Sequence, residues 1–251
     1  MAQQRAARLI AAQNVGSNAR LLEFTLEDEL GFIGGQYIIV NTGIPIAADK
    51  VAKRAYSILS GDTQQRRFQI AVRRIGSGPG SNYMFDLPLG AELAFSGPWG
   101  KYLPRDSQAS ERNTIVLASD TGITAAMGLI GAEKFAPHRE RTTLLWIAES
   151  DAYFLPEDFV RTRIESLCKQ FEIVRVSADP AQRANWLSTH KSTLLQRIQQ
   201  EHPTAVFLSG DGFLLAELRD ALQDEKHSTE VFIESFFHHQ ELKSVKVAAP
   251  S

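Results

Sequence analysis

The sequence predicts a β-barrel followed by an α/β unit. A six-stranded antiparallel barrel is expected at residues 1–108, and a Rossmann-like parallel sheet with helices at residues 109–251. Up to about residue 104, short apolar runs are separated by Gly, Asn, Asp or Pro, as in strands joined by turns. After a polar, unpatterned segment at 104–113, apolar strands alternate with helices, which is typical of a parallel sheet covered on both faces.

The first half contains six segments with strand-like apolar character. They are residues 8–15, 20–27, 36–42, 54–60, 67–74 and 91–96. Six short strands at this spacing predict a small closed barrel. One short helix is expected at 81–87, and the tight turn Gly97-Pro98-Trp99-Gly100 ends the barrel.

The second half alternates strands and helices. Strands are expected at 114–118, 142–148, 172–177, 205–209 and 231–233, and helices at 123–135, 156–171, 186–200 and from 210–212 to about 222. In sheets of this kind, ligands bind beyond the carboxyl ends of the strands, where loops lead into helix N-termini. Two loops, 119–124 and 209–213, meet this condition. The alternative is that each is an ordinary strand-to-helix turn.

The composition is that of a globular protein without a strong charge bias. With 27 basic and 29 acidic side chains the formal net charge is -2, so neither nucleic acid nor a membrane surface is predicted as a partner. A single cysteine, Cys168, excludes an intramolecular disulfide and an iron-sulfur cluster, which favours a cytoplasmic protein. No apolar run is long enough to span a bilayer. The adjacent His238 and His239 lack a third ligand at helical spacing, so no metal site is predicted.

One strand carries an arginine, a tyrosine and a serine at fixed offsets. Because side chains alternate along a strand, Arg54 and Tyr56 should point to one face and Ser57 to the other. An arginine binds a pyrophosphate, a tyrosine stacks on a ring system and a hydroxyl hydrogen-bonds a ring edge. The motif therefore suits a planar, phosphorylated cofactor. The alternative is an ordinary amphipathic strand with a cation-π contact.

A glycine-rich loop before the short helix is a second candidate. The segment from Gly76 to Asp86 contains three glycines before Ser81, and glycine lets the backbone approach a ligand closely. The first helical turn after Ser81 would offer unpaired amides to a phosphate. The alternative is a strand-to-helix turn capped by Ser81.

Six segments, taken in order, resemble the motifs of the ferredoxin-NADP reductase superfamily across nearly the whole chain. They are Arg54-Ala55-Tyr56-Ser57, Gly78-Pro79-Gly80-Ser81, Gly97-Pro98-Trp99-Gly100, Asp120-Thr121-Gly122-Ile123-Thr124-Ala125, Ser209-Gly210-Asp211-Gly212 and Glu234-Ser235-Phe236. Gly35-Gln36-Tyr37 also resembles the family's entry into a barrel strand. The resemblance implies a flavin-binding barrel that holds FAD and an α/β unit that holds a nicotinamide dinucleotide.

The resemblance also implies roles for individual residues. Arg54 would pair with the FAD pyrophosphate, Tyr56 would stack on the isoalloxazine, and Ser57 would hydrogen-bond near the flavin N5. Ser209 would border the nicotinamide and Glu234 the flavin, so Tyr56, Ser57, Ser209 and Glu234 are the candidate catalytic residues. The other implied cofactor-binding residues are Ala55, Ala71, Val72, Arg73, Gly78, Gly80, Ser81, Thr121, Gly122, Thr124, Gly210, Asp211 and Phe236.

The chain departs from the family pattern at the dinucleotide loops. Asp120 stands where the family usually has glycine, and Ala125 where it has proline. A carboxylate at the mouth of a helix that should receive a pyrophosphate repels it, at a cost of roughly 1 kcal/mol or more. Ser209 stands where many members have cysteine.

The implied function is that of an FAD-dependent NAD(P)H oxidoreductase. Hydride would pass from nicotinamide to flavin, and single electrons would then pass to a ferredoxin, a flavodoxin or an oxygenase component. Asp179 and Glu149 follow strands of the sheet, and carboxylates there favour NADH over NADPH, whereas Arg175 or Arg183 would reverse this. No cysteine follows Phe236, so an iron-sulfur partner is expected to be a separate protein.

Two other functions stay open. On the same fold, a free-flavin or ferric-siderophore reductase would need only a reduced flavin that is open to a small acceptor. Alternatively, the chain would be a flavin-holding electron-transfer or redox-sensing subunit without its own nicotinamide site, which Asp120 and Ala125 favour.

Overall fold

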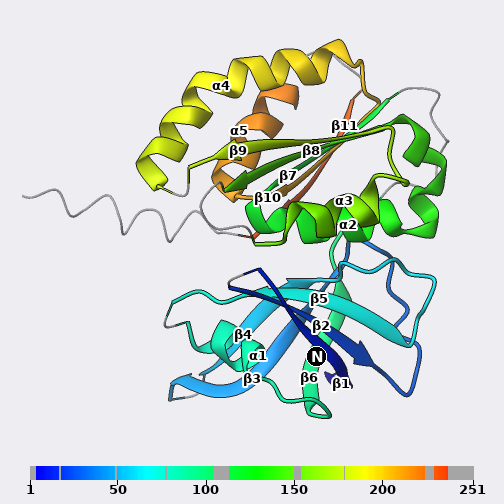
Figure 1. Cartoon of the computed structure of the whole chain (residues 1–251), viewed down its shortest axis with the longest axis vertical. Coiled ribbons are helices and arrows are strands. Elements are labelled where there is room, and N and C mark those ends of the chain that lie inside the picture. Colours follow the sequence, from blue (N-terminus) through cyan, green and yellow to red (C-terminus); the bar gives the residue numbers. More distant parts are fainter. Residues whose placement is uncertain are drawn as a thin grey trace, which may run out of the picture.

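The computed structural model describes residues 4–16, 18–48, 50–76, 78–103, 113–149, 154–177, 179–223 and 229–236. These residues form a six-stranded antiparallel sheet and a five-stranded parallel sheet. In Figure 1 the antiparallel sheet is the lower of the two. The predicted fold class is therefore confirmed. The polar segment at 104–113 lies outside the described residues except for Asn113, so the domain boundary at 108 stays a prediction.

The antiparallel sheet curls into a barrel-like module with the strand order β4-β3-β6-β1-β2-β5. Its strands are β1 (Gln4–Val15), β2 (Ala19–Thr25), β3 (Tyr37–Ala47), β4 (Lys50–Ser57), β5 (Arg67–Arg73) and β6 (Glu92–Trp99). Helix α1 (Pro79–Phe85) contacts both edge strands, β4 and β5, and so covers the opening between them. It begins two residues before the predicted 81–87, because proline is preset for the first helical turn.

The parallel sheet has the order β11-β10-β7-β8-β9. Its strands are β7 (Thr114–Ser119), β8 (Thr142–Glu149), β9 (Gln170–Val176), β10 (Ala205–Gly210) and β11 (Glu230–Ser235). The α-helices are α2 (Ile123–Gly131), α3 (Glu157–Ile164), α4 (Pro180–Gln200) and α5 (Gly212–Gln223), and two 3-10 helices are η1 (Asp120–Gly122) and η2 (Glu133–Arg141).

Helices cover both faces of the parallel sheet, as the alternating sequence pattern predicts. Along β7, Val116 and Ala118 pack into one core with α2 and α3, whereas Ile115 and Leu117 pack into another with α4 and α5. Figure 1 shows α2 and α3 between this sheet and the barrel, with α4 and α5 on the far side. The first of these cores also contains Leu59 and other barrel residues.

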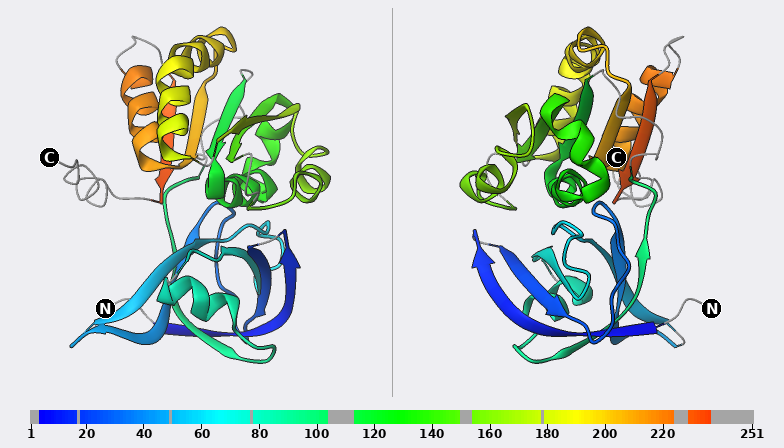
Figure 2. Two further views of the ribbon diagram at one scale, coloured as in Figure 1. Left: turned by 60° about the vertical axis from the view of Figure 1, so that its left-hand side comes forward. Right: turned by 90° about the vertical axis from the view of Figure 1, so that its right-hand side faces the viewer.

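Helix α2 packs directly on the barrel backbone. A β carbon on Gly128 would lie 2.2 Å from the carbonyl oxygen of Ile58, and one on Gly34 would lie 2.0 Å from the carbonyl oxygen of Gly128. The buried Asp62 carboxylate accepts hydrogen bonds from the amides of Gly34 (3.2 Å) and Glu133 (2.9 Å), one from each side of the junction. In both views of Figure 2, the green helix α2 lies against the barrel. These contacts fix how the two sheets face each other.

Within the described ranges, no helix is both long and apolar enough to cross a membrane.

Candidate functional site

A cleft of about 450 Å³ separates the end of β5 from the carboxyl ends of the parallel strands. Thr121 and Asp211, from the two predicted ligand loops, line it together with Arg73 from the barrel. The two loops also touch each other, since a β carbon on Gly122 would lie 2.2 Å from the carbonyl oxygen of Ser209. The structure therefore brings the two predicted loops to one cleft.

Side chains of the two loops stabilise this arrangement. The Thr124 hydroxyl donates to the carbonyl of Thr121 (2.9 Å), and the amide of Asp211 donates to the Ser119 hydroxyl (2.7 Å). Gly210 adopts a φ of 122°, and a β carbon there would lie 2.2 Å from the carbonyl oxygen of Ser119. Glycine is thus required at residue 210 for both its conformation and the close approach.

Ser209 is fully buried beneath the cleft. Its hydroxyl donates to the carbonyl of Gly122 (3.0 Å) and accepts a hydrogen bond from the Tyr102 hydroxyl (3.2 Å). Burial raises the pKa of Tyr102, so its phenol is a donor at neutral pH. The hydroxyl of Ser209 therefore positions the loop of Gly122, and its predicted contact with a nicotinamide stays a prediction.

The Arg54-to-Ser57 motif lies at the end of β4. Arg54 is exposed and donates to the carbonyl of Lys53 (2.8 Å), and a β carbon on Gly80 would lie 2.6 Å from its Cγ atom. The glycine at the start of α1 therefore lets the arginine lie across the helix. Ala55 is exposed, and the half-buried Tyr56 ring packs on the barrel core.

Ser57 carries a buried hydroxyl whose oxygen has no hydrogen-bond partner among the described residues. Ser57 pairs with Tyr37 across β3 and β4, one position beyond the pair of Tyr56 and Ile38. An unsatisfied buried hydroxyl costs about 1–3 kcal/mol, so the arrangement fits a ligand that supplies the missing hydrogen bond. A flavin ring edge has suitable donors and acceptors.

Glu234, at the end of β11, reaches the same region. A β carbon on Gly100 would lie 3.6 Å from the Glu234 Oε2 atom and 3.2 Å from the Tyr37 ring. Burial raises the pKa of Glu234 to about 7. Burial, together with the charge of Glu234, raises the pKa of Tyr37. Phe236 follows, and its amide donates to the carbonyl of Gly210 (3.0 Å).

The other residues predicted to contact FAD have their side chains engaged in the fold. Ala71 is buried at the junction and Val72 in the barrel core, so only their backbones can meet a ligand. The Ser81 hydroxyl donates to the carbonyl of Gly78 (3.1 Å) and accepts from the amide of Ile75 (3.3 Å), which stabilises the loop.

Arg73 points into the cleft. Its guanidinium bonds the carboxylates of Asp120 (2.7 Å) and Glu149 (2.8 Å). Burial alone would lower the pKa of Arg73, but the two carboxylates raise it by more, so the net shift of its pKa is upward. The predicted repulsion at Asp120 is therefore offset by a cation from the barrel. The sequence motifs did not reveal this pairing, nor the buried position of Tyr102 next to Ser209.

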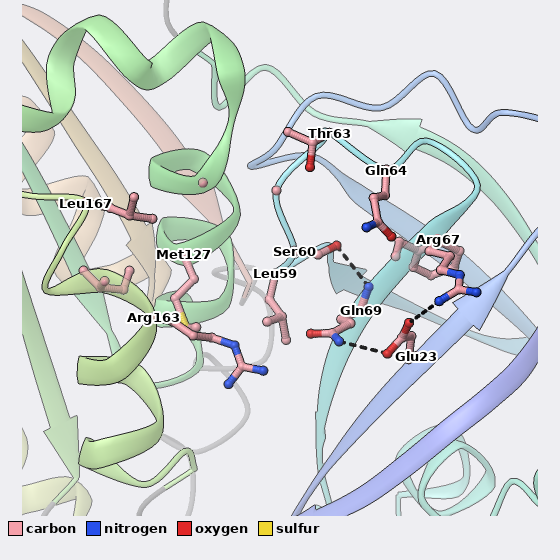
Figure 3. Close-up of a pocket in the computed structure, with 14 residues that line it drawn as sticks. Glu23, Leu59, Ser60, Thr63, Gln64, Arg67, Gln69, Met127, Arg163 and Leu167 are labelled. Carbon is pink, nitrogen blue, oxygen red and sulfur yellow. Dashed lines mark hydrogen bonds and ion pairs between the residues drawn. The ribbon is translucent and has the colours of Figure 1, made fainter.

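A second pocket of about 310 Å³ at the junction contains none of the predicted site residues. Figure 3 shows Arg163 of α3 extending toward Gln69 of β5, which hydrogen-bonds Glu23 at 3.1 Å. Within the described part of the chain, no group of three or more His, Cys, Asp or Glu is placed to hold a metal ion. His238 and His239 lie outside the described residues.

The comparisons with known proteins agree with this geometry. Residues 6–103 match the family model "Oxidoreductase FAD-binding domain". The chain is 33% identical over 171 residues to ferredoxin-NADP reductase B of Sorangium cellulosum, with 67% of this chain and 66% of that protein covered. The chain belongs to the ferredoxin-NADP reductase superfamily.

Other members of the superfamily are similar over shorter or more divergent alignments. NADH-cytochrome b5 reductase 2 of Neurospora crassa is 30% identical over 129 residues, with 50% of this chain and 36% of that protein covered. The chain thus spans less than two thirds of the length of either relative. The structure of a ferredoxin NADP+ reductase from Neisseria gonorrhoeae with bound FAD and NADP superimposes with a TM-score of 0.69 at 14% identity, covering 94% of this chain and 100% of that one. The last match supports the superfamily fold.

Proposed function

We propose that the chain is an FAD-dependent NAD(P)H oxidoreductase that delivers single electrons to a small carrier protein in the cytoplasm. The observation that carries this proposal is the buried, unpartnered hydroxyl of Ser57, next to Tyr37 at the junction of the two sheets. A hydroxyl held there without a partner fits the edge of a ring that enters from outside the fold.

The barrel residues fit an FAD molecule. When bound, FAD supplies the redox chemistry, taking up two electrons as a hydride and releasing them singly. The exposed Arg54 guanidinium lies next to Gly80 and would pair with the pyrophosphate. The half-buried Tyr56 would stack on the flavin with the part of its ring that the barrel core leaves uncovered, and the Ser57 hydroxyl would donate to or accept from the ring edge.

The carboxyl group of Glu234 can hold a proton close to Tyr37, next to the proposed flavin site. With its pKa at about 7, this carboxyl is partly protonated at neutral pH and is able to gain or lose a proton at Oε2. Burial keeps the carboxyl protonated at a pH where an exposed glutamate would be ionised. We propose that Glu234 exchanges protons near the flavin while electrons pass.

We propose NADH as the donor. Around β9, Arg175 bonds Glu157, and Asp179 caps α4 by accepting from the amide of Gln182 at 2.8 Å. An arginine already paired with a carboxylate is a poorer ligand for a 2′-phosphate than an unpaired one. A carboxylate that accepts one hydrogen bond, as Asp179 does, still has lone pairs that can accept from a ribose 2′-hydroxyl.

The proposed acceptor is a one-electron carrier: a ferredoxin, a flavodoxin or an oxygenase component. Two relatives are named as reductases of a ferredoxin and of cytochrome b5, both one-electron carriers, which supports this class. Comparing turnover with such carriers against turnover with free riboflavin or a ferric chelate tests it. Faster turnover with the small acceptors would favour a free-flavin or ferric-chelate reductase.

The experiment that tests the proposal is reconstitution with FAD followed by rapid anaerobic mixing with NADH or NADPH. We expect a yellow protein whose flavin absorbance is bleached by at least one donor, faster by NADH. A protein that binds no FAD contradicts the proposal. The second candidate is a flavin-holding subunit without its own nicotinamide site, which the two departures from the family pattern, Asp120 and Ala125, favour. A protein that binds FAD but is bleached by neither donor would support it.

A further inference from the structure

An arginine from the barrel, Arg73, faces the proposed dinucleotide cleft. Arg73, the last residue of β5, places its NH1 group 2.7 Å from Asp120 and its NH2 group 2.8 Å from Glu149. The exposed fractions of the three side chains are 19%, 19% and 8%, so the cluster is shielded from water. The two terminal nitrogens of one guanidinium thus bond two different carboxylates.

The two carboxylates stand where an anionic ligand should bind. Asp120 opens the turn before α2 and Glu149 ends the neighbouring strand β8, so both lie at the carboxyl edge of the sheet. Both line the cleft with Thr121. Without Arg73 they would bring two negative charges to this edge, and each would repel a pyrophosphate by about 1 kcal/mol or more in partly buried surroundings.

Other charges around the cleft are less able to replace Arg73. Arg74 also lines it but bonds Asp86 on the barrel side, and Asp211 adds a further carboxylate. The backbone of Asp120 is held as well, because the Trp146 indole donates to its carbonyl (3.0 Å), so the residue stays at this edge of the sheet. Among the described side chains that line the cleft, Arg73 is the cation that bonds both carboxylates.

We propose that Arg73 is a positioning residue of the dinucleotide cleft: it neutralises Asp120 and Glu149 and so allows an anionic dinucleotide to bind there. This inference rests on the proposed function. It assigns Arg73 to the dinucleotide, through the carboxylates, and not to the FAD. It also explains how a chain with aspartate in place of the family's glycine retains a usable cleft.

The test uses the FAD-loaded protein and the variant Arg73→Gln. Three quantities are measured: the Kd of NAD+ by calorimetry, the KM and kcat for the preferred donor, and the flavin content by absorbance. We expect the Kd and KM to rise about tenfold or more, kcat at saturating donor to change less than about threefold, and the flavin content to stay unchanged.

A double variant separates charge neutralisation from simple cross-linking of the modules. In Arg73→Gln/Asp120→Asn the repelling carboxylate is gone, so most of the lost dinucleotide affinity should return although the cross-link stays broken. The matched control is Arg67→Gln on the same strand, whose guanidinium lies 3.9 Å from Glu23 and outside the cleft. It should leave the Kd of NAD+ within about twofold.

The single variant Asp120→Asn keeps the test decisive even when Arg73→Gln fails to fold. It leaves Arg73 in place and removes a negative charge, so NAD+ should bind several-fold more tightly. Unchanged affinity in Asp120→Asn, loss of FAD from Arg73→Gln, or no rescue in the double variant overturns the inference. A wild-type flavin that neither donor reduces contradicts the proposed function instead.

Discussion

The Cα atom of Gly128 lies so close to the carbonyl group of Ile58 that a β carbon at residue 128 would stand 2.2 Å from its oxygen. Ile58 directly follows the Arg54-to-Ser57 motif, and Gly128 lies on the helix that begins at the dinucleotide loop. This backbone contact therefore sets the spacing between the two halves of the proposed site. The proposed hydride transfer would depend on that spacing, since a displacement of about 1 Å costs on the order of a hundredfold in rate.

We expect Gly128→Ala to lower the free energy of unfolding by about 1–3 kcal/mol, because the added methyl group meets backbone that cannot retreat. Urea denaturation measures this, and stopped-flow mixing with NADH should show slower flavin reduction. The control is Gly131→Ala on the same helix, where the nearest atom to an added β carbon is 3.3 Å away. Equal losses in the two variants would contradict the prediction.

Asp62→Asn should destabilise the junction. Its two carboxylate oxygens accept from the amides of Gly34 and Glu133, and an asparagine must turn an NH2 group toward one of these donors. A buried amide left without an acceptor costs about 1–3 kcal/mol, which a shift of the urea midpoint reports. Asp28→Asn, at an exposed position, should change stability by less than about 0.5 kcal/mol. Identical midpoints for the two variants would argue against the role of Asp62.

The sequence periodicity predicted the two sheets because it reports which faces are buried. The same signal misplaced three helix ends. The helix expected at 186–200 begins at Pro180, and the helix expected at 123–135 ends at Gly131. The helix expected at 156–171 stops at Ile164, although Leu167 and Phe171 still pack on the same core from a turn and a strand. Apolar residues at every third or fourth position therefore do not distinguish one continuous helix from a shorter helix followed by a turn and a strand that pack on the same core. The pairing of Arg73 with Asp120 spans 47 positions and joins two modules, so no local pattern encodes it.

Ser57→Ala should have opposite effects with and without FAD. In the FAD-free protein the change removes a buried hydroxyl that has no described partner, so stability should rise by about 1 kcal/mol. In the loaded protein, FAD affinity should fall about tenfold, because a hydrogen bond to the ring is lost. Thr143→Val is the matched control, since its buried hydroxyl is likewise without a described partner but lies on β8. Were Ser57→Ala to keep full FAD affinity, the assignment of Ser57 would be wrong.

Glu234→Gln should remove a pH dependence of stability. Burial raises the pKa of Glu234 from 4.5 to about 7, so between these values the native state binds more protons than the unfolded state. The stability that this group contributes to the wild type is therefore fully present below about pH 4.5 and is lost as the pH rises through 7. After allowance for partial exposure, the free energy of unfolding should fall by about 1–3 kcal/mol over this range. Urea unfolding of the FAD-free protein from pH 5 to 8 measures the slope, which should flatten in Glu234→Gln and persist in Glu92→Gln, an exposed position. If stability changed with pH in the same way in wild type and Glu234→Gln, the Glu234 carboxyl would titrate as it does in water. It would then be ionised at neutral pH and could not hold the proton that the proposed function assigns to it.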